Sequence, residues 1–332
     1  MEEALMAEDK KILLKKRQEF EKYKQKKQRI LSQDSYIPMI IRKAIRPLLR
    51  GMLWGSRKLQ GYEIEILNRT KIPQGKPVIF AVSHIAKLDF EIVSEVIKQQ
   101  YFVLAADYML VKGKFPGLFF WMNGVVYVDV LDKNDRRNSR DLMIKILKQN
   151  GNIMIFPECA WNLSPNEIIY DIQLGAVDMA LETGAVIVPI SLEQYEDWKK
   201  FVINMGNVID LNRINESTRE CKINKTSELR DILATLKYEI WEREGITKRS
   251  DIKSNYWSDF VLRRCTEWPG YDFHGQIDNC YIPKSKLEYW DLMHDLRNMK
   301  VSETNKFLFV KKDQFLQEKT VGRRCVFENC DV

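Results

Sequence analysis

Residues 77–89 hold an apolar run that leads directly into polar residues, Pro77-Val78-Ile79-Phe80-Ala81-Val82-Ser83-His84-Ile85-Ala86-Lys87-Leu88-Asp89. A short apolar run is typical of a buried strand, whose following polar residues lie in a loop at its carboxyl end. Ligands of open α/β sheets bind at that edge. The run therefore predicts a central strand that delivers His84 and Asp89 to a functional site.

A second apolar run follows about seventy residues later and has the same form. Ile153-Met154-Ile155 leads into Phe156-Pro157-Glu158-Cys159. Two interpretations of Glu158 are open: a charged residue that enters solvent, or a carboxylate that faces the same cleft as His84. In the second interpretation it binds the acceptor or orients a helix.

Apolar runs and helical stretches alternate between Gly61 and about Leu211, which predicts an α/β fold with a mostly parallel central sheet flanked by helices. The expected strands are residues 62–66, 77–83, 101–105, 124–130, 152–157, 185–192 and 201–209. The expected helices are residues 90–99, 139–149, 173–183 and 226–243. We expect three regions, which are a basic amphipathic segment over 1–60, the α/β domain over 61–248 and a carboxyl-terminal extension of unknown role over 249–332.

Cysteine content and hydropathy indicate the cellular compartment. The six Cys are scattered and form no C-x-x-C pair, so we expect neither a disulfide framework nor a zinc site, and a reducing cytosol fits best. The first thirty residues are too charged for a signal peptide. No uncharged run approaches the roughly 20 residues that cross a bilayer. We expect a cytoplasmic protein.

Positive charge is concentrated at the amino end. Residues 1–60 contain sixteen Lys and Arg against seven Asp and Glu, a net charge of +9, so the remaining 272 residues carry −2 of the chain's +7. A localised basic segment attracts an anionic surface, either lipid or nucleic acid. Because the rest of the chain is slightly acidic, we expect a membrane surface and no nucleic acid.

Two helical stretches make up this basic segment. Residues 9–31 predict a solvated basic helix, which either meets that surface or has no specific role. In residues 36–54, basic and apolar residues fall on opposite faces of a helix, which Pro47 would kink or break. This pattern is typical of an interfacial membrane helix, and a helix packed on the domain's own core is the alternative.

His84 and Asp89 are a plausible catalytic base and its orienting carboxylate. A histidine with a pKa near ~6.5 accepts a proton at cellular pH, and a neighbouring carboxylate fixes its tautomer. A His and an Asp five residues apart also occur by accident. The position at a strand's carboxyl end favours the catalytic interpretation.

Four blocks of the sequence resemble the glycerolipid acyltransferase superfamily, the family of 1-acylglycerol-3-phosphate acyltransferases. They are the two motifs above, Gly124-Val125-Val126-Tyr127-Val128-Asp129 and Val188-Pro189-Ile190, in the family's order over roughly residues 60–215. The resemblance implies an acyl-thioester-dependent O-acyltransferase of phospholipid biosynthesis that uses no metal or cofactor. His84 would take the proton of an acceptor hydroxyl, which attacks acyl-CoA or acyl-carrier protein without an acyl-enzyme. Backbone donors near the motif would stabilise the oxyanion.

The sequence departs from the family where its members bind the acceptor's phosphate. The family's Glu-Gly-Thr-Arg is Glu158-Cys159-Ala160-Trp161 here, and Val130 replaces an Arg that usually follows the Asp of another block. We expect Cys159 to be a small packing residue rather than a nucleophile, and Trp161 to offer a flat apolar wall to the acceptor. The substitute cations near these motifs are Lys87, Lys133, Arg136 and Arg137.

The leading hypothesis is therefore an acyltransferase that is peripheral on the inner face of a membrane, held there through residues 1–60. Its default acceptor is a lysophospholipid such as lysophosphatidic acid. One alternative is transfer to a non-phosphate acceptor, such as a glycan, an amine or another small molecule. The other is a non-catalytic module that binds membranes or anionic polymers on a degenerate acyltransferase scaffold.

Overall fold

The computed structural model describes residues 14–15, 17–29, 39–86, 88–106, 120–130, 132–159, 161–162, 168–195, 199–212, 214 and 218–244. The expected carboxyl-terminal extension and the candidate cation Lys87 lie outside the described residues. The proposed boundaries at residues 60 and 248 stay predictions.

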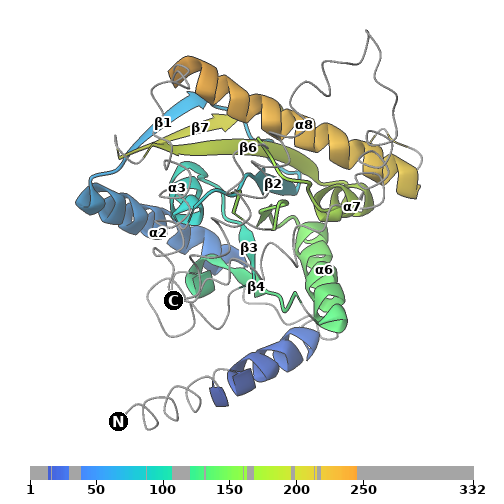
Figure 1. Cartoon of the computed structure of the whole chain (residues 1–332). Coiled ribbons are helices and arrows are strands. Elements are labelled where there is room, and N and C mark those ends of the chain that lie inside the picture. The colour runs from blue at the N-terminus through green and yellow to red at the C-terminus, as the bar shows by residue number, and fades with distance from the viewer. Residues whose placement is uncertain are drawn as a thin grey trace, which may run out of the picture.

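A seven-stranded sheet forms the centre of the molecule, with the order β1-β7-β6-β2-β5-β3-β4 (Figure 1). The strands are β1 (Glu63–Asn68), β2 (Val78–Val82), β3 (Phe102–Ala105), β4 (Val125–Tyr127), β5 (Ile153–Ile155), β6 (Val186–Tyr195) and β7 (Lys200–Met205). Neighbouring strands are parallel except for β6 and β7. The predicted α/β class and its mostly parallel sheet are confirmed, and each expected strand is present.

Among the described residues, five helices with assigned bounds flank this sheet, and each of them overlaps an expected helical stretch. They are α2 (Met39–Gln60), α3 (Asp89–Val96), α6 (Lys133–Lys148), α7 (Gly175–Thr183) and α8 (Arg219–Glu244). Helix α6 begins earlier than its expected start at residue 139, because the side chain of Asp132 accepts hydrogen bonds from the amides of Asn134 and Asp135. Such a cap satisfies donors that a helix start otherwise leaves unpaired.

Alternate residues of β2 face opposite layers of the fold. Val78, Phe80 and Val82 pack into a buried cluster with residues of α2 and α3. Ile79 and Ala81 belong to a second cluster, built with α6, α7 and α8. Because successive side chains of a strand point to opposite faces, one fully buried strand requires helices on both sides of the sheet. These two layers hold β2 and its carboxyl end at the centre.

Of the kink or break expected at Pro47, the break is wrong, because α2 continues through this residue to Gln60. A proline inside a helix costs about 3 kcal/mol or more. Arg46 and Leu49 on either side of it are buried, and Arg46 donates hydrogen bonds to the carbonyls of Ser94 and Ile97. This anchoring to α3 offsets the lost helical hydrogen bond.

The two faces of α2 have an unexpected orientation. Its buried face contains Arg42, Arg46, Leu49 and Leu53, so the helix does pack on the domain's own core. Its apolar residues on the other side are exposed, with Leu59 92% accessible. These exposed residues are Ile40, Ile41, Leu48, Met52, Trp54 and Leu59. Membrane contact by this face stays a prediction.

The helical residues 17–29 are not the solvated helix expected there. Phe20 and Lys27 are buried. The ammonium of Lys27 lies 2.5 Å from the Asp135 carboxylate and donates hydrogen bonds to Ser139 Oγ and the Tyr127 carbonyl. A buried ammonium requires such partners. This helix is therefore fastened to β4 and α6.

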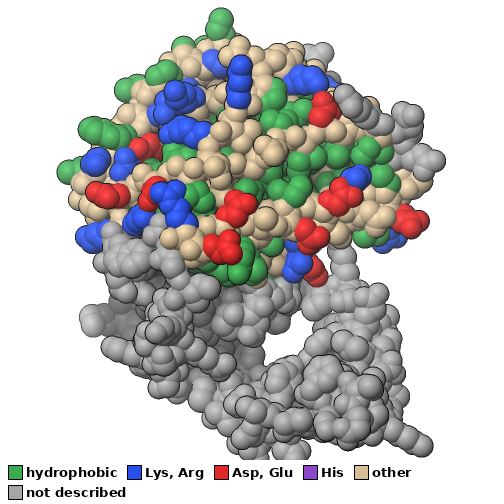
Figure 2. All heavy atoms as spheres, turned by 90° about the horizontal axis from the view of Figure 1, so that it is seen from above, with side chains coloured by type: hydrophobic (Ala, Val, Ile, Leu, Met, Phe, Trp, Pro, Cys, Tyr) green, Lys and Arg blue, Asp and Glu red, His purple; other side chains and the backbone are tan. Residues whose placement is uncertain are grey.

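Charges of both signs are interspersed on the side of the molecule where α8, β1 and β7 lie (Figure 2). Glu65 of β1 pairs with Lys200 of β7 and with Arg243 of α8, which neutralises charge locally. Within the described ranges, no helix has the length and apolar character needed to cross a membrane.

Candidate active site

The loop after β2 is held as an extension of the sheet before it turns into α3. The amide of Ser83 donates to the carbonyl of Ile190, and Ser83 Oγ accepts a hydrogen bond from the amide of Leu192, both in β6. His84 follows at the carboxyl end of β2, and Asp89 is the first residue of α3. The turn between them brings the two side chains together, as the sequence predicted.

The imidazole of His84 faces the buried carboxylate of Asp89. His84 Nδ1 lies 2.9 Å from Asp89 Oδ2, which also accepts hydrogen bonds from the amides of Ile85 and Ala86. An oxygen that already accepts two amide hydrogen bonds acts as an acceptor toward the imidazole as well. Nδ1 therefore carries the ring proton and donates it to Asp89, and Nε2 keeps a lone pair. The negative charge also lies at the first turn of α3, where the helix dipole stabilises it. With its side chain 23% exposed, His84 is accessible to a substrate.

Glu158 lies behind this pair and not in an open cleft. It is buried, and its two oxygens accept hydrogen bonds from the amides of His84, at 2.8 Å, and Tyr170, at 3.0 Å. Burial raises the pKa of the Glu158 carboxyl above its usual range, and the positive charge of Lys237 opposes this. The solvated interpretation is wrong, because Glu158 is buried, whereas binding of the acceptor by its carboxylate stays a prediction. Glu158 positions the loop that carries His84.

Two aromatic rings fix the orientation of the imidazole. The ring of Phe156 stacks on that of His84, with centroids 4.2 Å apart, and Trp161 meets it edge-on at 6.1 Å. The expected open wall at Trp161 is wrong, because this residue is only 3% exposed and packs beside the histidine. The role of Phe156 was not predicted from the sequence. Its place directly after β5, the neighbour of β2, is the signal that could have indicated it.

Cys159 occupies a turn with a positive φ of 60°. Glycine adopts this conformation without strain, which explains why the resemblance places glycine there. The Cys159 thiol is exposed and its sulfur lies 3.7 Å from the carbonyl oxygen of Pro157. The expected packing role is therefore wrong, because the side chain of Cys159 is exposed and only its backbone conformation is specialised.

The candidate cations on α6 follow a strand that is not a neighbour of the histidine strand, and their role as substitute phosphate ligands stays a prediction. Lys133, Arg136 and Arg137 are exposed in the first turns of α6, which follows β4. In the sheet, β5 and β3 separate β4 from β2. Three strand spacings of about 4.8 Å put β4, the strand before α6, about 14 Å from the histidine strand. Arg136 also donates a hydrogen bond to the carbonyl of Val130.

Backbone donors within the motif are already engaged. The amide of His84 donates to Glu158, and those of Ile85 and Ala86 donate to Asp89. The expected oxyanion stabilisation by donors near the motif therefore cannot use these three amides. They instead build the geometry of the histidine.

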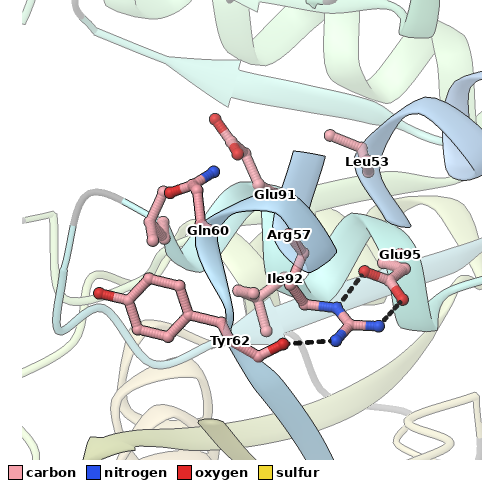
Figure 3. Close-up of a pocket in the computed structure, with 8 residues that line it drawn as sticks. Leu53, Arg57, Gln60, Tyr62, Glu91, Ile92 and Glu95 are labelled. Carbon is pink, nitrogen blue, oxygen red and sulfur yellow. Dashed lines mark hydrogen bonds and ion pairs between the residues drawn. The ribbon is translucent and has the colours of Figure 1, made fainter. Parts of the chain in front are cut away.

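A small cavity lies between α2, α3 and the start of β1 (Figure 3). Its volume is about 10 Å³, which holds at most one water molecule. Arg57 crosses it to pair with Glu95 and with the carbonyl of Tyr62. This cavity is a small gap between packed helices and not a substrate site.

The segment that contains the histidine loop matches a known protein family. Residues 63–193 match the family model described as Acyltransferase. This segment is an acyltransferase domain of the glycerolipid acyltransferase superfamily. The match spans β1 to β6 and so includes the His84–Asp89 pair, Glu158 and their aromatic neighbours.

The chain is similar in sequence to one curated protein and in fold to one solved structure. A 1-acyl-sn-glycerol-3-phosphate acyltransferase of Borreliella burgdorferi is 26% identical to this acyltransferase over 197 residues, which cover 56% of this chain and 75% of the relative. The crystal structure of the 1-acyl-sn-glycerophosphate (LPA) acyltransferase PlsC from Thermotoga maritima matches with a TM-score of 0.49 and 14% identity. It covers 62% of this chain and 83% of that chain.

Proposed function

We propose that this acyltransferase moves a fatty acyl group from acyl-CoA or acyl-carrier protein to the hydroxyl of a lysophospholipid, with lysophosphatidic acid as the default acceptor. The observation that carries the proposal is the 2.9 Å contact between His84 Nδ1 and Asp89 Oδ2. It holds the imidazole in the tautomer of a general base and leaves Nε2 for the acceptor.

The proposed reaction is a direct acyl transfer in two steps, addition and elimination. The acceptor oxygen attacks the thioester carbonyl carbon while its proton passes to Nε2 of His84. The tetrahedral intermediate then expels the thiolate, whose sulfur takes the proton back from the imidazolium. Asp89 stabilises the imidazolium through its buried carboxylate. The thioester is already activated, so this chemistry needs no metal, cofactor or acyl-enzyme.

The choice of acceptor rests on the named relative from Borreliella, a 1-acyl-sn-glycerol-3-phosphate acyltransferase. Two features favour a different acceptor. Trp161 takes the place of the arginine that holds phosphate in the family, and the basic side chains of α6 follow β4, which is three strands away from β2. A non-phosphate hydroxyl acceptor is therefore the second candidate.

We also propose that the enzyme works at a membrane surface on the cytoplasmic side. The exposed apolar residues of α2, such as Leu48, Trp54 and Leu59, are suited to the boundary between headgroups and acyl chains. Lys43 and Lys58 are exposed on the same helix and would favour anionic lipids. A lysophospholipid acceptor is found in that boundary, so docking there would bring the enzyme to its substrate.

An acceptor screen tests the proposal. Labelled acyl-CoA or acyl-carrier protein is offered with lysophosphatidic acid, other lysophospholipids, glycans and amines, and products are identified by mass spectrometry. We expect acylated lysophospholipid from the wild type and a loss of about 10²- to 10⁴-fold in His84→Ala, with unchanged circular dichroism. Full activity in the folded variant would contradict the assigned base, and a glycan product would select the second candidate.

A further inference from the structure

Helix α8 is fixed to β6 and β7 and lies outside residues 63–193, the segment that matches the family model (Figure 1). Ser191 Oγ of β6 donates a hydrogen bond to the carbonyl of Leu233 at 2.7 Å. Asn204 Nδ2 of β7 donates one to the carbonyl of Leu236 at 2.9 Å. All four residues are buried, and buried polar groups that are satisfied in this way make a contact rigid. Side chains of α8 that reach a neighbouring loop therefore hold that loop to the sheet.

The short segment from Ile168 to Tyr170 supports the histidine loop. The carbonyl of Ile168 accepts a hydrogen bond from Asn162 Nδ2 at 3.0 Å. The amide of Tyr170 donates one to Glu158 Oε2, also at 3.0 Å. Asn162 and Glu158 in turn hold the carbonyl and the amide of His84. The segment is therefore connected to both backbone groups of the histidine.

Arg230 of α8 binds one peptide group of this segment. Its Nη2 donates to the carbonyl of Ile169 at 2.9 Å, and its Nε donates to the carbonyl of Tyr170 at 3.2 Å. The Ile169 carbonyl and the Tyr170 amide belong to the same planar peptide group. This group is therefore held by Arg230 at its oxygen and by Glu158 at its nitrogen. A hydrogen bond to the oxygen polarises the group and strengthens the one that its amide donates.

Lys237 lies two turns after Arg230 on the same face of α8 and is 4% exposed. Its ammonium lies 3.5 Å from Glu193 Oε2, which also accepts a hydrogen bond from Trp241 Nε1 at 2.9 Å. Its positive charge also opposes the rise that burial causes in the pKa of the Glu158 carboxyl. Because a buried charge requires a compensating partner, Lys237 serves two carboxylates. One of them, Glu158, holds the histidine loop.

We propose that Arg230 and Lys237 are positioning residues, which act on His84 through Glu158. Arg230 aims the Tyr170 amide at the carboxylate, and Lys237 keeps that carboxylate charged, so that it accepts hydrogen bonds at both oxygens. This role rests on the proposed function, in which His84 is the general base. It places part of the support of the active site in a helix outside the family match. A displacement of about 1 Å in a catalytic group can cost about 10²-fold in rate.

Arg230→Gln tests the contact to the peptide group. The whole chain is assayed with labelled acyl-CoA and lysophosphatidic acid. We expect kcat to fall by about 10- to 10²-fold with little change in KM, because the variant misplaces the base and leaves substrate binding intact. Arg219→Gln removes an exposed arginine of the same helix and should retain the wild-type kcat. A wild-type kcat in Arg230→Gln, or a rise in KM alone, would overturn the role of Arg230.

A double variant tests whether Arg230 acts through Glu158. If it does, the effects of Arg230→Gln and Glu158→Gln on the activation free energy are not additive. The double variant should then lose less kcat than the product of the two single losses. Losses that multiply would show that Arg230 acts by another route, which contradicts the proposed path.

Two substitutions of Lys237 separate charge from packing. We expect Lys237→Met to lower kcat by about tenfold, and Lys237→Arg to restore it to within about threefold, since arginine keeps the positive charge. Lys225→Met is the control, because the ion pair of Lys225 with Glu228 lies within α8, and it should retain the wild-type kcat. Equal losses in the Met and Arg variants of Lys237 would assign the effect to shape, and the charge role would be wrong.

Hydrogen exchange read by mass spectrometry tests the positioning without a substrate. In Arg230→Gln we expect residues 83–86 to exchange about tenfold faster or more, while residues 78–82 of β2 and the Arg219→Gln control exchange as in the wild type. Unchanged exchange of the loop would overturn the proposal. Faster exchange of β2 as well would also overturn it, because this indicates a general loss of stability. Full activity in folded His84→Ala would contradict the proposed base instead, and the exchange rates would still decide whether Arg230 holds the loop.

Discussion

Glu158 holds His84 by its main chain. Oε1 of Glu158 accepts a hydrogen bond from the His84 amide at 2.8 Å, and Oε2 accepts one from the Tyr170 amide at 3.0 Å. The carboxylate thus ties the loop after β2 to the segment that follows β5. Because the Asn162 amide also donates to the His84 carbonyl, at 2.7 Å, both backbone groups of the histidine are fixed from the neighbouring loop. Positioning of the base is the function that these contacts support.

Replacing Glu158 by Gln should destabilise the protein in a pH-dependent way. The amide offers one acceptor oxygen for two amide donors, so we expect a loss of about 1–3 kcal/mol in the free energy of unfolding. Burial raises the folded pKa of Glu158 above its unfolded value, so the wild type loses stability as pH rises through the folded pKa. Residue 158 of the Gln variant does not titrate. The difference in the free energy of unfolding between the wild type and this variant should therefore be largest at acid pH and become smaller toward neutral pH. Urea unfolding across this range measures it, and a gap that widens with rising pH would contradict the assignment.

The sequence predicted those parts of the site that depend on chain order alone. His84 and Asp89 follow one strand and begin one helix, so alternation of strand and helix was sufficient to bring them together. The position of Glu158 could not be predicted in this way, because its partner Tyr170 lies in a loop without a periodic pattern. The stack of Phe156 on His84 depends on β5 being the neighbour of β2, and strand order is not written in local periodicity.

Asp89→Asn should lower activity far more than stability. The carboxylate fixes the tautomer of His84 and stabilises the imidazolium, and an amide does neither in a defined orientation. We expect kcat to fall by about 10²- to 10⁴-fold with little change in KM. Asp141→Asn, on the exposed side of α6, is the matched control and should retain wild-type rates. A comparable loss in both variants, or none in Asp89→Asn, would show that this carboxylate does not act through the base.

Lys27→Met should detach the helix of residues 17–29, whereas Lys26→Met should not. Lys27 is buried and pairs with Asp135, while Lys26 next to it is exposed. Removing one partner of a buried ion pair leaves the other charge unpaired, which costs about 3–5 kcal/mol. Limited proteolysis should cleave the first variant within this helix at a much higher rate than the control. Equal rates of cleavage would mean that the ion pair does not fasten the helix.

The pattern of α2 shows how far amphipathicity can be interpreted from a sequence. The basic and apolar faces were predicted, but which face would meet the protein was not. Arg42 and Arg46 are buried because carbonyl groups at the ends of neighbouring helices accept their hydrogen bonds. A sequence does not show such acceptors, so a basic face was assigned to an anionic surface by its charge alone.

Exposed apolar residues of α2 should determine binding to vesicles. Deleting residues 1–60 would also remove Leu49 and Leu53 from the core, so point variants are the sharper test. We expect Leu48→Gln with Leu59→Gln to reduce sedimentation with anionic vesicles by more than about tenfold, because each apolar side chain contributes about 1.5–3 kcal/mol when it leaves water. The control, Ile223→Gln with Tyr238→Gln, changes two exposed residues of α8 and should bind as the wild type does. Since apolar burial is not screened by salt, the difference should persist across a salt series. A difference that disappears at high salt would instead assign binding to the basic residues alone.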